Sequence, residues 1–89
     1  MATSIRDLKK DINYVLGDII EATYIVEEVN PKVDKKKTEA IVDEAIEIFD
    51  DLIAKVNDRS VENRKAHLKS VNQELEDRGR KLIEKLNKL

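Results

Sequence analysis

One stretch decides the fold of this chain: residues 5–29, IRDLKKDINYVLGDIIEATYIVEEV. Apolar residues recur in it at alternating steps of three and four, which places them along one face of a helix. These residues are Ile5, Leu8, Ile12, Val15, Ile19, Ala22, Val26 and Val29. Because a strict seven-residue repeat drifts by about 20° per heptad from the helical period, the pattern predicts left-handed, coiled-coil-like packing against other helices.

The composition supports helices throughout the chain. Of its 89 residues, 40% are charged and 3% are aromatic, a balance typical of long amphipathic helices and unlike that of sandwiches or barrels. One proline and two glycines leave room for few and short loops. The sequence therefore predicts a single all-α domain over residues 1–89.

A second helix is predicted over residues 35–57, where an apolar arc lies opposite a row of carboxylates. The arc contains Ile41, Val42, Ala45, Ile46, Ile48, Phe49, Leu52, Ile53 and Val56. Asp34 is a suitable N-cap for this helix. Three consecutive lysines, residues 35–37, oppose the positive end of the helix dipole, so the helix is expected to fray as far as Thr38.

A third helix is predicted over residues 61–88, with Ser60 as its N-cap. Gly79 lies on its apolar stripe and indicates either close approach to a neighbouring helix or a kink. The stripe keeps its phase across this glycine, which favours one continuous helix. Short turns at residues 30–34 and 57–60 then predict a three-helix antiparallel up-down-up bundle.

Several classes of protein are excluded or disfavoured by absent residues. The chain has no cysteine, which excludes disulfides, thiolate catalysis and thiolate metal sites. No segment has the pattern of a signal peptide or the length and apolarity of a membrane span. We therefore expect a cytoplasmic protein with no membrane partner.

His67 is the only histidine, and Ala66-His67-Leu68-Lys69-Ser70 resembles the motif of histidine-phosphotransfer proteins. In that family the lysine follows the histidine by three residues and shares its face, whereas Lys69 follows by two, and the family's small glycine is absent here. Phosphotransfer through His67 is therefore a remote alternative. The preferred interpretation is a flank histidine beside Glu74 and Arg78.

No set of residues predicts an active site. The carboxylates on residues 43–51 have metal-like spacing, but metal sites in bundles need inward-facing carboxylates and a Glu-x-x-His pair, which the chain lacks. General acid–base and nucleophilic catalysis need positioned titratable pairs in a pocket, and none is visible. We predict no metal, no cofactor and no enzyme activity, and instead a protein–protein interaction or assembly module.

Charge is distributed unevenly along the chain. Residues 1–30 hold three basic and six acidic side chains, residues 31–57 five and seven, and residues 58–89 nine and six, giving net charges of −3, −2 and +3. The preferred interpretation is that a basic helix lies between two acidic ones. The alternative is a nucleic-acid-associated regulator, although an acidic chain binds polyanions poorly. Its candidate contacts are Lys35, Lys36, Lys37, Arg78, Lys81 and Lys85.

A candidate self-association surface lies beside the apolar seam of the first helix. Ile20 and Tyr24 fall outside the seam, and Gly17 continues their strip toward the N-terminus. Leaving a large apolar side chain in water forgoes about 1.5–3 kcal/mol relative to burying it. The strip therefore predicts a two-fold homodimer, or alternatively cover by a neighbouring helix or by residues 32–37.

The segment Ile5-Arg6-Asp7-Leu8-Lys9-Lys10-Asp11-Ile12-Asn13-Tyr14, with Asn30-Pro31 and Lys65-Ala66-His67, is similar to small α-helical proteins of Bacteroidetes bacteria. The resemblance covers the whole chain but consists mostly of common helix-forming residues. It implies a bacterial cytoplasmic setting and carries no activity with it.

Overall fold

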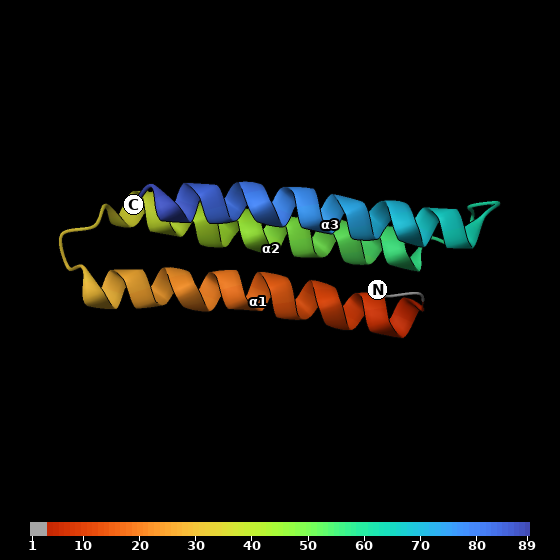
Figure 1. The fold of residues 1–89 in the computed structure, drawn as a ribbon, viewed down its shortest axis with the longest axis horizontal. Coiled ribbons are helices and arrows are strands. Elements are labelled where there is room, and N and C mark those ends of the chain that lie inside the picture. Colours follow the sequence, from red (N-terminus) through yellow and green to blue (C-terminus); the bar gives the residue numbers. More distant parts are fainter. Residues whose placement is uncertain (1–3) are drawn as a thin grey trace.

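The computed structural model describes residues 4–89, most of which belong to three helices: α1 (Ile5–Val29), α2 (Lys35–Asn57) and α3 (Arg64–Asn87). The helices run up, down and up, and the two loops lie at opposite ends of a rod 49 Å long (Figure 1). Each helix packs against both of the others. No strand occurs among residues 4–89. The predicted all-α three-helix antiparallel bundle is confirmed.

The two ends of α1 follow directly from local sequence. The Ser4 hydroxyl oxygen accepts a hydrogen bond of 3.1 Å from the backbone N–H of Asp7, which satisfies one of the unpaired N–H groups of the first turn. The helix ends at Val29 because Asn30 precedes Pro31, and a residue in that position avoids the helical region.

The start of α2 differs from the expected fraying. Asp34 accepts a hydrogen bond of 2.9 Å from the backbone N–H of Lys36, and residues 35–37 are helical. Thr38 is fully buried inside the helix, where its hydroxyl donates to the carbonyl oxygen of Lys35 at 2.9 Å. The expectation of fraying as far as Thr38 is therefore wrong, because the Asp34 carboxylate supplies both the cap and a negative charge beside the lysines.

The start of α3 lies three residues later than predicted. Ser60 is not the N-cap, since its backbone N–H and its hydroxyl both donate to Asp58, at 2.9 and 2.6 Å. These two hydrogen bonds hold the pKa of Asp58 below its usual value, and the bond from the Ser60 hydroxyl has the larger effect. Asn63 caps α3 instead by accepting from the backbone N–H of Ala66 at 3.1 Å, and the helix begins at Arg64.

The buried face of α1 matches the predicted seam only in part. The seam residues that are buried are Leu8, Ile12 and Ile19. Leu16 and Thr23 also lie inside, with Leu16 only 1% exposed, whereas Val15 is half-buried and Val29 is 77% exposed. The reason is that α1 faces α2 and α3 together, so its inward direction points between two neighbours. The Thr23 hydroxyl satisfies its burial by donating to the carbonyl oxygen of Ile19 at 2.7 Å.

α2 and α3 complete the core. Their buried apolar residues are Ile41, Ala45, Ile48, Leu52, Val56, Leu68, Val71, Leu75 and Leu82. α3 continues without interruption through Gly79, which is buried. A Cβ atom at Gly79 would lie 3.3 Å from Cγ1 of Val15, so the glycine allows α3 to approach α1 closely. Close approach is one of the two explanations that the sequence left open for this residue.

Candidate interaction surface

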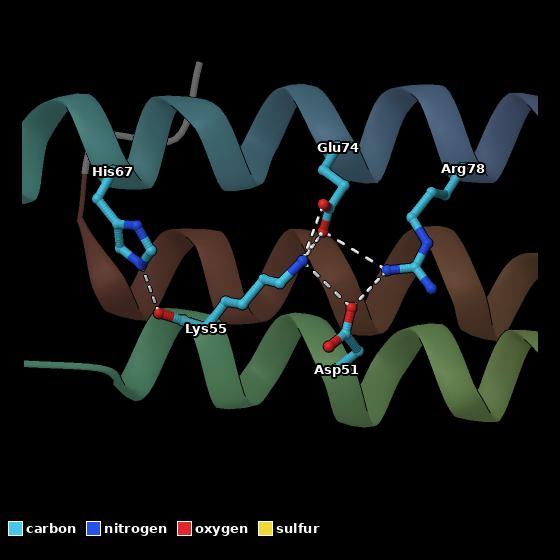
Figure 2. A network of polar contacts seen from close by, with 5 residues as sticks. All are labelled: Asp51, Lys55, His67, Glu74 and Arg78. Carbon is cyan, nitrogen blue, oxygen red and sulfur yellow. Dashed lines mark hydrogen bonds and ion pairs between the residues drawn. The ribbon is translucent and has the colours of Figure 1, made fainter. Parts of the chain in front are cut away.

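The densest polar cluster joins α2 to α3 (Figure 2). The Lys55 ammonium donates to both carboxylate oxygens of Glu74, at 2.9 and 2.8 Å, and lies 3.3 Å from Oδ2 of Asp51. Arg78 donates through Nη1 to the same oxygen of Asp51 at 2.6 Å, and lies 3.5 Å from Glu74. Two cations and two carboxylates therefore form a closed network, with no charge left over.

The network shifts the pKa values of its members in the direction that keeps them charged. Hydrogen bonding from Arg78, and then from Lys55, lowers the pKa of Asp51. Hydrogen bonding to Glu74, and then to Asp51, raises the pKa of Lys55. Both side chains remain more than two-fifths exposed, so solvent weakens these attractions. The network joins α2 to α3 through side chains of both helices.

We expect the stability of the bundle to follow the charge of this network. Because the pKa of Asp51 is lowered, its contribution is complete above its unfolded-state pKa of about 3.9 and is lost as pH falls through the folded-state value. The raised pKa of Lys55 gives a contribution that is complete below about pH 10.4 and is lost as pH rises further. Urea unfolding of the wild type and Asp51→Asn should show a wild-type advantage at neutral pH that is lost as pH falls through the folded-state pKa of Asp51. A pH-independent difference would contradict this.

His67 has a structural contact that the sequence did not reveal. Its Nε2 donates to the backbone carbonyl oxygen of Lys55 at 2.6 Å, as Figure 2 shows. This carbonyl belongs to the last turn of α2, where it also accepts a hydrogen bond of 3.2 Å from the backbone N–H of Asp58. His67 therefore links the C-terminal end of α2 to α3. Phosphoryl transfer through Nε2 would require this hydrogen bond to break.

The six candidate polyanion contacts belong to the first turn of α2 and to the C-terminal half of α3. Arg78 belongs to the α2–α3 network, and Lys85 donates to Glu44 of α2 at 2.9 Å. Lys37 and Lys85 do line one groove of about 640 Å³, but Asp43, Glu44 and Glu47 line the same groove. The remaining three candidates, Lys35, Lys36 and Lys81, are exposed. Two of the candidates on α3, Arg78 and Lys85, thus pair with carboxylates of α2.

A groove between α1 and α2 has a different, apolar character. It measures about 220 Å³ and is lined by Asn13, Leu16, Gly17, Ile20, Ile46 and Phe49, without a charged side chain. A second groove, between α1 and α3, is larger at about 440 Å³, but charged residues line it, including Asp11, Glu76 and Arg80. Of these three grooves, only the smallest has no charged side chain in its lining, and it contains Gly17 and Ile20 of the predicted strip.

The structure brings together two of the three predicted strip residues. Gly17 and Ile20 lie in the α1–α2 groove, where Ile20 is half-buried and packs against the core. Tyr24 lies one turn further along α1, outside the groove lining, and is 55% exposed. Apart from the adjoining residues and backbone of α1 itself, no heavy atom lies within 4 Å of the position of a Gly17 Cβ, so this position is open to the outside.

Two further residues of this surface, Ile46 and Phe49, come from α2, and the sequence placed both in the apolar arc of that helix. Ile46 is 49% exposed and Phe49 is half-buried, so the apolar arc extends beyond the buried core. The apolar arc of α2 is wide enough to extend past α1. This width was the one feature of the sequence that could have indicated exposed apolar residues on α2. We call Gly17, Ile20 and Tyr24, together with Ile46 and Phe49, the α1–α2 face.

Comparison with protein-family models, curated proteins and solved structures gives no match for this chain. Within residues 4–89, no group of three or more histidine, cysteine, aspartate or glutamate residues is placed to hold a metal ion. None of the three helices is long and apolar enough to cross a membrane.

Proposed function

We propose that this chain is a non-enzymatic protein–protein interaction or assembly module that binds its partner through the α1–α2 face. The observation that carries the proposal is the uncharged groove between α1 and α2, with Ile46 and Tyr24 half-exposed beside it. Contiguous apolar surface of this kind is typical of sites that another protein covers. The closed α2–α3 network supports the same conclusion, because its charged groups already satisfy one another.

Retention of proteins from a native lysate tests this proposal. Immobilised wild-type protein should retain at least one protein that Tyr24→Glu and Ile46→Glu both lose, because a carboxylate on the face would be desolvated on binding. Ala66→Glu is the matched control, since Ala66 is exposed on α3 and lies outside the face. All variants should keep the helical circular dichroism of the wild type. Equal retention by face variants and control would contradict the proposal.

The alternative, a nucleic-acid-associated regulator, predicts a different result. Polyanion binding releases counterions, so affinity for DNA or RNA should then fall steeply between about 50 and 200 mM salt. Pairing of Arg78 and Lys85 with carboxylates of α2 disfavours this alternative, because phosphates would have to compete with those partners. We expect no such salt-dependent binding to DNA or RNA. Lys81→Ala should therefore behave like the wild type in the same salt titration.

A further inference from the structure

An exposed strip runs along the full length of α1 and crosses the α1–α2 face. Its residues are Arg6, Lys10, Gly17, Tyr24 and Glu28, and each is exposed. They are separated by four or seven residues, which keeps them on one side of a helix. Its N-terminal part is basic and its C-terminal end is acidic. We call these five residues the α1 strip.

The spacing of the α1 strip is symmetric about Gly17. Lys10 and Tyr24 each lie seven residues from it, and Arg6 and Glu28 each lie eleven residues from it. Two copies of α1 that cross antiparallel at Gly17 therefore place Arg6 opposite Glu28 of the second copy. Lys10 comes opposite Tyr24 of the second copy, where a cation can lie against an aromatic ring. A parallel arrangement would instead place like charges together at both ends.

The charged ends of the strip form no ion pair within the part of the chain that the structure describes. Among the salt bridges of residues 4–89, none involves Arg6, Lys10 or Glu28. Lys10 lies over a ring of its own helix, with Nζ 5.7 Å from the centroid of Tyr14. These groups are therefore free to pair with another molecule whose charges run in the opposite direction, and a second copy of α1 has that pattern.

We propose that the occupant of the α1–α2 face is a second copy of this chain, which packs its α1 antiparallel against the first across a two-fold axis at Gly17. This inference rests on the proposed function and names the partner. Within residues 4–89, neither α2 nor α3 comes within 4 Å of the position of a Gly17 Cβ, so packing within the bundle does not require glycine there. At the axis, the missing side chain allows two helix backbones to approach closely. The two faces meet at one interface, as a two-fold axis requires.

Sedimentation equilibrium of the wild type at micromolar concentration is the first test. A dimer of the 10.3 kDa chain is expected, and Gly17→Lys should dissociate it because two ammonium groups would meet at the axis. Ala54→Lys, which adds the same group at an exposed position of α2 outside the face, should leave the dimer intact. A wild-type monomer would overturn the second-copy inference. The proposed function would then still stand if the face variants lose a different protein from the lysate.

Cross-linking tests the position of the axis. Because the chain has no cysteine, Gly17→Cys introduces a single thiol, and the two copies of that thiol should lie within disulfide reach of each other. We expect its oxidation to a covalent dimer to be at least about tenfold faster than that of Ala66→Cys, whose thiols would lie far apart. Equal rates for the two variants would overturn an axis at Gly17.

Charge reversal tests the antiparallel register. Arg6→Glu should raise the dimer dissociation constant about tenfold, as should Glu28→Arg, because each turns two attractive contacts per dimer into repulsive ones. The double variant restores opposite charges across the axis, and its dissociation constant should return to within about threefold of the wild type. A double variant as weak as the single ones would overturn the register.

Discussion

Replacing Leu16 by alanine is expected to lower the free energy of unfolding by about 2–5 kcal/mol, because the truncation removes a buried side chain and leaves a cavity. Leu16 is 1% exposed and lies on the face of α1 that points between α2 and α3. The heptad pattern would instead place Val15 in the core. Val15 is half-buried, and Val15→Ala should cost clearly less.

Chemical denaturation at a fixed protein concentration measures this difference, since association would make stability depend on concentration. Leu86→Ala is a control of the same chemistry, because Leu86 is only half-buried against the core. Its cost should be smaller than that of Leu16→Ala. Equal losses for Leu16→Ala and Leu86→Ala would contradict the burial that the structure gives to Leu16.

Replacing Ala45 by leucine is expected to destabilise the bundle by about 1–3 kcal/mol through overpacking. Ala45 is fully buried on α2, a helix that packs against both α1 and α3. A larger side chain at this position would have to move a neighbouring helix or adopt a strained rotamer. The small residue therefore sets how closely the three helices approach.

Ala54 provides a matched comparison on the same helix, because it is exposed. Ala54→Leu makes the same chemical change without crowding and should alter stability by less than about 0.5 kcal/mol. Urea midpoints of the two variants check the prediction. A neutral Ala45→Leu would show that the core adapts more readily than its packing indicates.

Local sequence signals predicted most of the helix bounds. Ser4 and Asp34 accept the expected capping hydrogen bonds, and Pro31 lies just after the end of α1. The start of α3 was misplaced because Ser60 and Asn63 are both good N-caps by residue type. Asp58 decided between them, since it accepts both the hydroxyl and the backbone N–H of Ser60.

Only the α1 residues of the candidate surface could be predicted from the sequence. Gly17, Ile20 and Tyr24 lie outside the apolar seam, and this can be counted on a helical wheel. Ile46 and Phe49 could not be separated from the core in the same way, because they belong to one continuous apolar arc of α2. Which edge of such an arc is covered depends on how far α1 reaches across it.

The sequence by itself determined the fold class, the number of helices and the antiparallel order, because hydrophobic periodicity, capping residues and short turns act over a few residues. Tertiary structure decided which apolar residues are inside, as Leu16 and Val15 show, because burial depends on the direction of two neighbouring helices at once. It also paired Lys55 with Glu74 and Arg78 with Asp51, and gave His67 its partner at the end of α2. Such contacts join residues far apart in the chain, and periodicity within one helix carries no information about the register between two.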